Sequence, residues 1–401
     1  MQKLVVIGNG MAGFACLEQI RQRDHNFEIT IFGDERRANY DRKVLPSVLA
    51  GVKSPGDIAL NDLNWYQDNG ILTRLGVRVT RLDRQRRLVV DEDGGSTAYD
   101  RLILATGARP WLPPLPGLER ENVYTLRTLD DALSILQLLR GGMRAAVIGG
   151  GVLGVETACA LQAHDCDVTL VQLADRLMER QLPAVASRYL QRRMESRGIR
   201  VLLGTETQSL IGGGRVEGLR FVSGEVLPAD VVIIAAGIRP EVELALHAGL
   251  EVGRGVVVND NMETSAQDVS AAGGCTEHRG RTFGLGDAIQ EQARALAAAI
   301  TGDRGPAFTG VVPVTRLRLP GIEIVSAGGV DDAGIETLEY EDQAETYKKL
   351  FLRDNRLLGF VLAGDISDEP RYLDWLRHGT DLGALRRQLL SPRSLEETAL
   401  T

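Results

Sequence analysis

Two glycine-rich segments carry the residue pattern in this sequence that is most directly tied to chemistry. The first reads Gly8-Asn9-Gly10-Met11-Ala12-Gly13, after the apolar run 4–7 and before an apolar-periodic segment at 14–20. This spacing predicts a strand, a tight turn and a helix whose N-terminal N–H groups and dipole bind a pyrophosphate. One such turn is weak evidence, because similar glycines occur in ordinary strand-to-helix connections.

The same pattern returns about 140 residues later, which makes it an internal repeat. The repeat reads Gly149-Gly150-Gly151-Val152-Leu153-Gly154, between an expected strand at 144–148 and an expected helix at 155–163. Two motifs in the same strand-turn-helix context predict two βαβ units, and therefore two bound dinucleotides.

The residues after the second strand of each unit indicate which dinucleotide it binds. Asp34 and Glu35 follow the expected strand 27–32, and an acid about 20 residues beyond the glycines holds a ribose 2′-hydroxyl. The sequence does not choose between these two acids. The corresponding residue of the second unit is Gln172, and no pair of arginines follows it to take a 2′-phosphate. We therefore expect FAD at the first turn and a nicotinamide dinucleotide at the second, with NADH favoured and NADPH possible.

Composition excludes several other functions. The 401 residues carry a net charge of −8, which argues against nucleic-acid binding. The chain has no apolar run of the roughly 20 residues that span a bilayer, and no clear signal-peptide cleavage site, so we expect a cytoplasmic protein that does not enter a membrane. None of the four cysteines forms a Cys-x-x-Cys pair, so we expect buried core thiols and no metal site.

The connections between elements predict nested domains. The expected strands 102–107 and 230–237 run into Ala108-Arg109-Pro110 and Ile238-Arg239-Pro240, respectively. Two matched exits predict two chain crossings between the domains. Residues 61–75 are expected to form a short helix and a connection, and 288–300 a helix.

The pattern changes from about residue 310. Alternating segments predict strands at 314–319 and 323–327, a hairpin at 347–352 and 357–362, and a helical region that begins at Trp375. Residues 331–345 hold seven acids and no base, which is typical of a solvated face, with a protein-docking patch as the alternative. The tail from Ser391 is expected to be poorly ordered.

Several of these segments together resemble the FAD- and NAD-dependent pyridine-nucleotide oxidoreductases, and are most similar to the flavin portion of NADH-dependent assimilatory nitrite reductase large subunits. The resemblance covers nearly the whole chain. The matching segments are 5–13, Tyr40-Asp41-Arg42, 49–51, 177–182 and 274–281. The resemblance implies an α/β fold with two nested Rossmann-like nucleotide-binding domains, as in glutathione reductase, and a C-terminal α/β domain. The implied boundaries are 1–115 and 241–308 for the FAD domain, 116–240 for the NAD domain and 309–401 for the C-terminal domain.

The resemblance also implies roles for individual residues. Arg42 and Lys43 are candidates to neutralise the FAD phosphates, with solvated loop charges as the alternative. Glu156 is expected near the nicotinamide ring, with a helix N-terminal acid that serves the dipole as an equal alternative. Gly274 stands where relatives carry an acid that contacts the flavin ribityl chain. The remaining cofactor-binding residues implied by the family motifs are Ala105, Thr106, Gly107, Ala236 and Gly237.

The expected function is that of an FAD-dependent NAD(P)H oxidoreductase, in which NADH delivers a hydride to FAD and the electrons pass to a redox partner with a metal centre. The expected partners are a nitrate or nitrite reductase catalytic subunit, rubredoxin or ferredoxin. We expect no iron–sulfur or sirohaem portion in this chain, and internal disulfide chemistry is not expected because no cysteine lies near Pro46 and Ser47. The alternatives are an NADH oxidase and a non-catalytic flavoprotein that senses NADH.

Overall fold

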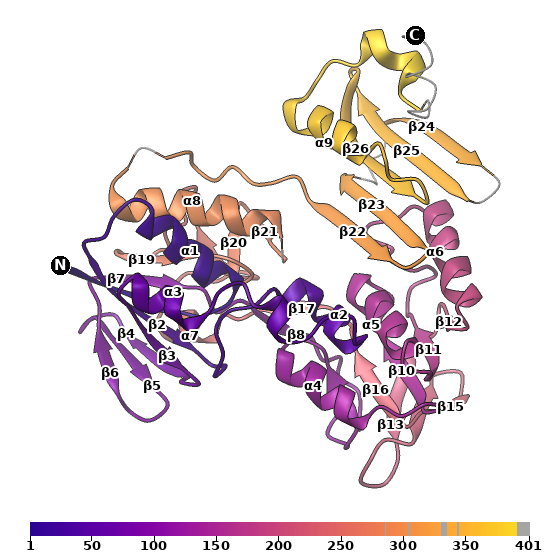
Figure 1. Ribbon diagram of the computed structural model, residues 1–401, viewed down its shortest axis with the longest axis horizontal. Coiled ribbons are helices and arrows are strands. Elements are labelled where there is room, and N and C mark those ends of the chain that lie inside the picture. Colours follow the sequence, from indigo (N-terminus) through magenta and orange to yellow (C-terminus); the bar gives the residue numbers. More distant parts are fainter. Residues whose placement is uncertain (285, 304, 330–334, 343–344, 391–401) are drawn as a thin grey trace.

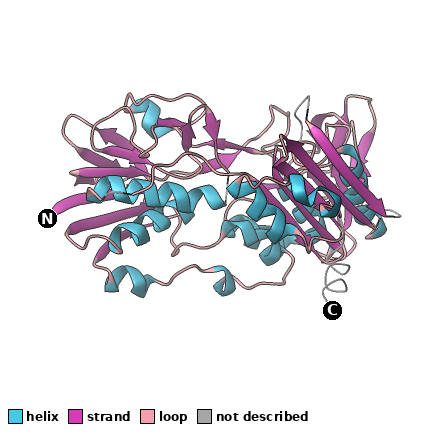
Figure 2. Cartoon of the chain, turned by 90° about the horizontal axis from the view of Figure 1, so that it is seen from above, coloured by secondary structure: helices cyan, strands magenta, loops and turns pink. Residues whose placement is uncertain are grey.

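The computed structural model describes residues 1–401 except 285, 304, 330–334, 343–344 and 391–401. The chain forms three bodies: two are built on parallel sheets, and the third is built on an antiparallel sheet near the C-terminus (Figure 1). Seen from above, the molecule is elongated, with the N-terminus at one end (Figure 2). The predicted disorder of the tail from Ser391 lies outside the described residues, as does part of the acidic run 331–345.

The first parallel sheet carries the first glycine turn. Its strand order is β19-β7-β1-β2-β3, and every neighbouring pair is parallel. Residues 4–7 of β1 are buried in one hydrophobic cluster with helix residues such as Leu17 and Leu296 and with Leu82 and Val89 of a smaller antiparallel sheet. The strands are β1 (Gln2–Ile7), β2 (Phe27–Gly33), β3 (Ile71–Leu75), β7 (Arg101–Leu104) and β19 (Val269–Ala271).

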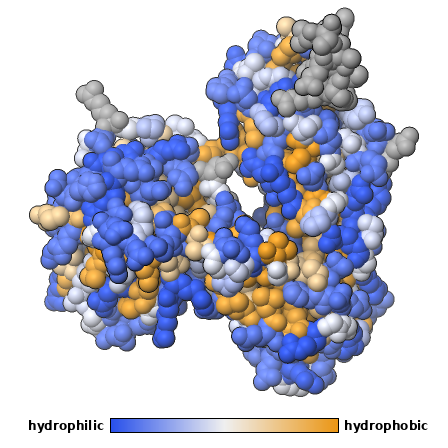
Figure 3. Space-filling model, in the orientation of Figure 1, coloured by the Kyte–Doolittle hydropathy of each residue, from blue (hydrophilic) through white to orange (hydrophobic). Residues whose placement is uncertain are grey.

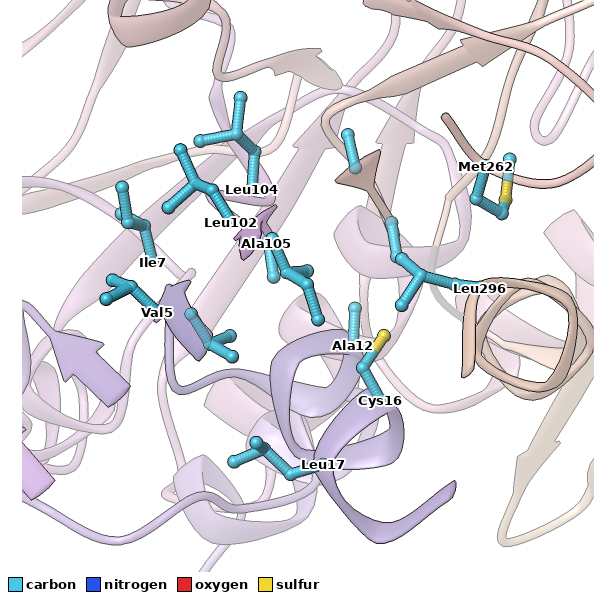
Figure 4. Packing of buried hydrophobic residues seen from close by; sticks show 14 of the residues in the cluster. Val5, Ile7, Ala12, Cys16, Leu17, Leu102, Leu104, Ala105, Met262 and Leu296 are labelled. Carbon is cyan, nitrogen blue, oxygen red and sulfur yellow. The ribbon is translucent and has the colours of Figure 1, made fainter. Parts of the chain in front are cut away.

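Helices α1 (Met11–Arg21) and α8 (Asp287–Thr301) pack side by side against this sheet. Figure 4 shows Cys16 and Leu17 of α1 and Leu296 of α8 on one side of the strands, and Val5 and Ile7 of β1 on the other. The helix expected at 288–300 is confirmed. Within 61–75 only α3 (Leu63–Asp68) is helical; the expected connection is instead strand β3.

The second parallel sheet carries the second glycine turn, in the order β12-β11-β10-β16-β9. Helices α4 (Leu129–Leu138), α5 (Val152–Gln162) and α6 (Ala184–Ser196) belong to this body. Its strands are β9 (Val123–Thr125), β10 (Arg144–Ile148), β11 (Asp167–Val171), β12 (Arg200–Leu202) and β16 (Val231–Ile234).

The two predicted crossings lie next to each other. Strand β8 (Ala108–Pro110) pairs antiparallel with β17 (Ile238–Pro240), so the outgoing and returning chains form one two-stranded ribbon between the parallel sheets. After the second crossing the chain returns to the first sheet through β19, which confirms the nested arrangement. The exact domain boundaries stay a prediction.

Smaller elements complete these two bodies. Three short sheets are formed by β4 (Val79–Asp83), β5 (Leu88–Asp91) and β6 (Ser96–Ala98); by β13 (Thr207–Ile211), β14 (Gly218–Phe221) and β15 (Val226–Pro228); and by β18 (Val256–Val258), β20 (Thr276–His278) and β21 (Arg281–Thr282). The short helices are η1 (Arg42–Val44), α2 (Leu45–Leu49), η2 (Gly56–Ile58) and α7 (Glu243–His247).

Helix α2 follows the first-sheet strands in sequence but packs against the second body. Leu45, Val48 and Leu49 are buried in one hydrophobic cluster with α4 and α5, and Nε2 of His164 lies 2.7 Å from the carbonyl oxygen of Leu49. The segment that carries Arg42 is therefore held between the two bodies that are built on parallel sheets.

The third body is a five-stranded antiparallel sheet in the order β22-β23-β26-β25-β24. One face packs against α9 (Glu369–His378) and η3 (Gly383–Gln388), and the other joins the hydrophobic cluster of α5 and α6. The helix begins at Glu369, earlier than the expected Trp375. The strands are β22 (Val314–Leu319), β23 (Ile322–Gly328), β24 (Glu336–Asp342), β25 (Thr346–Arg353) and β26 (Arg356–Ala363).

Candidate active site

The first glycine turn has no room for side chains at two of its glycines and open space at the third. Gly8 has φ +114°, and a Cβ there would overlap the carbonyl oxygen of Ala105. A Cβ on Gly13 would overlap the carbonyl oxygen of Gly8, so helix and strand approach closely. A Cβ on Gly10, the N-cap of α1, meets no atom within 4 Å. The helix N-terminus therefore faces open space of the kind that a pyrophosphate fills.

The second turn reproduces this geometry. Gly149 also has φ +114°, and a Cβ there would overlap the carbonyl oxygen of Ala235, while a Cβ on Gly154 would overlap that of Gly149. Gly151, the N-cap of α5, again has open space around it. The two predicted dinucleotide turns are thus alike in backbone and in the space that they leave.

A cleft of about 510 Å³ lies at the first turn. Two of the residues predicted for FAD do not line this cleft: Gly13 packs helix α1 closely against the turn, and Lys43 lines a second cavity. The surface of the molecule is visibly hollowed between the first body and the other two (Figure 3). The cleft brings together twelve residues predicted for FAD, namely Gly8, Asn9, Gly10, Met11, Ala12, Asp34, Glu35, Arg42, Ala105, Thr106, Gly107 and Gly274.

The two candidate ribose acids have different surroundings. The carboxylate of Glu35 accepts hydrogen bonds from the Tyr40 hydroxyl at 2.7 Å and from the Arg42 guanidinium at 2.5 Å. The side chain of Asp34 is 67% exposed, and its ion pair with Arg78 spans 4.0 Å. Asp34 is therefore the acid whose oxygens are accessible to a ribose, whereas Glu35 holds Arg42 in place.

Two buried polar side chains that the glycine pattern did not predict, Tyr66 and Asn39, lie next to Asn9 of the cleft. The Tyr66 hydroxyl donates to Oδ1 of Asn9 at 2.7 Å and lies 3.2 Å from Oδ1 of Asn39. The Nδ2 group of Asn9 is buried without a hydrogen-bond partner among the described residues. A buried amide donor without a partner beside an open anion-binding turn fits a polar ligand such as FAD.

Arg127 is a second residue that the sequence did not reveal. It lines both the first cleft and the second cavity, and its Nε donates to the carbonyl oxygen of Ala108 at 2.9 Å. Burial, together with the nearby Arg42, lowers the pKa of Arg127 to about 10, so the guanidinium stays cationic at neutral pH. Arg127 and Arg42 place two positive charges where an anionic cofactor is expected. The only sequence signal nearby was the capping box that Thr128 and Asp131 form at the start of α4.

The second cavity, of about 470 Å³, adjoins the first cleft and shares Arg42, Pro110, Arg127 and Ile238 with it. Burial raises the pKa of Glu156 from its ordinary value of 4.5 to about 7. A carboxyl with a raised pKa, in a cavity that adjoins the first cleft, is a candidate functional group. Other predicted residues in this cavity are Lys43, Val152, Leu153 and Gly237, and Arg316 of β22 joins them from the third body.

Gln172 follows β11 as predicted, but its amide already has partners. Its Oε1 accepts from the N–H of Gly150 at 2.8 Å, and its Nε2 donates to Oε2 of Glu179 at 2.9 Å. Gly274 lies against Gly107 and Ala108, with space of ordinary van der Waals size for a Cβ.

All four cysteines are buried, which confirms the predicted core thiols. Burial raises the pKa of Cys16 to about 12, so this thiol stays protonated at neutral pH. Among the described residues, no group of three or more His, Cys, Asp or Glu side chains is arranged to hold a metal ion.

Comparison with known proteins identifies the family. Residues 2–299 match the family model described as pyridine nucleotide-disulphide oxidoreductase. The chain belongs to the pyridine nucleotide-disulphide oxidoreductase family. Residues 313–380 match a second model, the rubredoxin NAD+ reductase C-terminal domain.

Curated relatives cover nearly all of this chain. The assimilatory nitrate reductase electron transfer subunit of Bacillus subtilis (strain 168) is 38% identical over 396 residues, which are 98% of this chain and 51% of that protein. The nitrite reductase [NAD(P)H] of the same organism is 39% identical over 399 residues, or 98% of this chain and 50% of that protein. The chain thus spans about half the length of these curated relatives.

The fold is shared with the crystal structure of the covalent putidaredoxin reductase–putidaredoxin complex, at a TM-score of 0.87 and 27% identity, covering 95% of this chain and 94% of the other. Members of the pyridine nucleotide-disulphide oxidoreductase family use FAD and NAD(P)H, which confirms the predicted oxidoreductase class and cofactors. In the part of the chain that the structure describes, no helix is both long and apolar enough to cross a membrane.

Proposed function

We propose that this protein passes a hydride from NADH to FAD and then passes electrons to a metal-containing partner protein, as the electron-transfer component of an assimilatory nitrate or nitrite reductase system. FAD, when bound, accepts electrons as a pair and releases them singly or in pairs, while the protein supplies binding and orientation. The observation that carries the proposal is the contact between the two cavities. The cleft at Gly8–Gly13 and the cavity at Glu156 share four lining residues, so groups bound in the two spaces lie next to each other.

The residues of this chain have separable tasks in that proposal. Gly10 and Gly151 leave room for two pyrophosphates at helix N-termini. Asp34 binds the adenosine ribose of FAD, and the cationic Arg42 and Arg127 neutralise its phosphates. Glu156 lies at the nicotinamide end, where a neutral carboxyl can donate a hydrogen bond to an amide oxygen and an ionised one can only accept.

The relatives support the nitrate or nitrite assignment. Both Bacillus subtilis proteins match this chain over 98% of its length at 38% and 39% identity. A rubredoxin reductase is the second candidate, because residues 313–380 match the rubredoxin NAD+ reductase C-terminal domain. The cytoplasmic location expected from the sequence stays a prediction.

The test has two stages, both with FAD-loaded protein under anaerobic conditions. NADH is expected to bleach the flavin absorbance within a stopped-flow trace, and failure to bleach with either NADH or NADPH would refute the proposal. The reduced protein is then mixed with a nitrate reductase catalytic subunit, a sirohaem nitrite reductase portion, rubredoxin or air-saturated buffer. Fastest reoxidation by rubredoxin would establish the second candidate, and fastest reoxidation by oxygen would identify an NADH oxidase.

A further inference from the structure

The second nucleotide-binding unit carries an acid seven residues beyond the position where the glycine motif predicts one. Gln172 stands at the strand end, with Oε1 2.8 Å from the N–H of Gly150 and Nε2 2.9 Å from the carboxylate of Glu179. Because a main-chain N–H can only donate and a carboxylate can only accept, these two contacts assign the orientation of the amide. Glu179 is thereby held at the edge of the turn.

We propose that Glu179 is the residue that selects NADH over NADPH, with Gln172 as the residue that positions its carboxylate. The inference rests on the proposed nicotinamide dinucleotide site. In dinucleotide-binding units, an acid at the strand end accepts a hydrogen bond from the ribose 2′-hydroxyl. Here the strand-end position holds an amide, and the negative charge lies one hydrogen bond further along, on Glu179.

The loop that carries Glu179 is anchored on the glycine turn itself. The N–H of Met178 donates to the carbonyl oxygen of Gly150 at 2.9 Å. The side chains of Leu177 and Met178 are both fully buried. A Cβ on Gly150 would come within 2.7 Å of a Leu177 methyl group, so turn and loop are in direct contact. The carboxylate therefore keeps a fixed position relative to the N–H groups that bind the pyrophosphate.

The charges at this edge disfavour a 2′-phosphate. Two donors of Arg176 face acceptors, since Nη1 lies 3.2 Å from the carboxylate of Asp175 and Nη2 lies 3.5 Å from the carbonyl oxygen of Glu179, whereas its Nε is buried without a hydrogen-bond partner among the described residues. Arg180, which follows Glu179 in the chain, is exposed to solvent. A doubly charged phosphate roughly 5 Å from one carboxylate is disfavoured about tenfold even in a medium as polar as water.

The experiment uses FAD-loaded protein and two probes that lack the nicotinamide ring, ADP-ribose and 2′-phospho-ADP-ribose, with dissociation constants measured by calorimetry. The wild-type protein is expected to bind ADP-ribose at least about tenfold more tightly. In Glu179→Gln, which keeps the size of the side chain, that preference is expected to fall about tenfold. The control Asp175→Asn removes the same charge from a side chain that is 81% exposed, and should change the preference less than twofold.

A reciprocal variant separates the charge from the fold. In Gln172→Glu with Glu179→Gln, the acid moves to the strand end, and the preference for ADP-ribose should return. An unchanged preference in Glu179→Gln, or equal binding of the two probes to the wild-type protein, would overturn the inference and leave the proposed function standing. Binding of neither probe would overturn both. Selective binding of ADP-ribose without flavin bleaching by NADH would support the inference and refute the proposed hydride transfer.

Discussion

The buried carboxyl of Glu156 makes the stability of this protein depend on pH in a way that one substitution should remove. In the unfolded chain the group ionises with its ordinary pKa of 4.5, and in the folded protein burial raises that pKa to about 7. As far as Glu156 is concerned, the free energy of unfolding is therefore highest below pH 4.5 and falls as the pH rises to about 7. In that range the unfolded chain has released the proton, so folding must either take a proton up or bury the charged carboxylate. Above that pH the loss amounts to about 3 kcal/mol.

Glu156→Gln keeps the shape and removes the ionisation. We expect the variant to gain about 3 kcal/mol in the free energy of unfolding relative to the wild-type protein between pH 4.5 and pH 8. Urea unfolding of the FAD-loaded proteins at several pH values measures this difference. The matched control is Glu119→Gln, since the Glu119 side chain is 78% exposed. Parallel pH dependences for Glu156→Gln and wild type would refute the conclusion that burial raises the pKa of Glu156.

The same substitution has a consequence for nucleotide binding. If Glu156 faces the nicotinamide, its loss of a proton near pH 7 turns a hydrogen-bond donor into an acceptor only. NADH affinity in the wild-type protein should then fall as the pH rises through about 7, and in Glu156→Gln it should stay flat across that range. An inflection that persists in the variant would show that another group is responsible.

Three further predictions concern cofactor binding and the third body. Gly10→Ala should fold normally and lose FAD, because its Cβ enters only the open space at the α1 N-terminus. Gly13→Ala should instead lower the free energy of unfolding by about 3 kcal/mol, because its Cβ overlaps the backbone. Thermal melts with and without FAD distinguish the two variants. Gly274→Asp should be accommodated and bind FAD about tenfold more tightly, as measured by FAD titration of the apoprotein. The control Gly273→Ala should be destabilised, because Gly273 has φ +84° and a Cβ there would overlap the side chain of Ala12. Lys348→Met should cost about 2–3 kcal/mol in urea unfolding, because it removes the ammonium 2.8 Å from the fully buried Asp368 and leaves that carboxylate with the guanidinium of Arg371 at 2.9 Å. An unaltered midpoint would contradict this.

The sequence was sufficient where a local pattern determines a local structure. Both glycine turns, the central strands that precede them and the two paired crossings were predicted. Apolar runs, and the glycines that a tight turn requires, can be recognised directly along the sequence. Strand β3 was missed because it lies at the sheet edge, where Thr73 and Arg74 interrupt the apolar run. The start of α9 was missed because its first residue, Glu369, is buried through ion pairs with Arg316 and Arg318 and therefore does not read as a core position.

The candidate site was predictable in its backbone and less so in its charges. Arg127 enters the site from the segment before α4 through the crossing of the chain, and no spacing in the sequence marks it. The choice between Asp34 and Glu35 depended on Tyr40 and Arg42, whose contacts with Glu35 require the folded loop. Side chains that converge from separate segments cannot be assigned by a motif that describes one segment.

The two copies of the glycine turn have similar backbones but different surroundings. The second residue of the first turn is Asn9, whose side chain extends to Tyr66 and leaves a buried amide donor beside the cleft. At the same place the second turn has Gly150, where a Cβ would lie 2.7 Å from Leu177 and 3.0 Å from Gln172. Removal of one side chain lets the loop that follows β11 pack onto the turn, and this contact brings the carboxylate of Glu179 to the nucleotide edge. We therefore expect the shared motif to supply the pyrophosphate site, and the residue between its first two glycines to decide which neighbouring segment completes it.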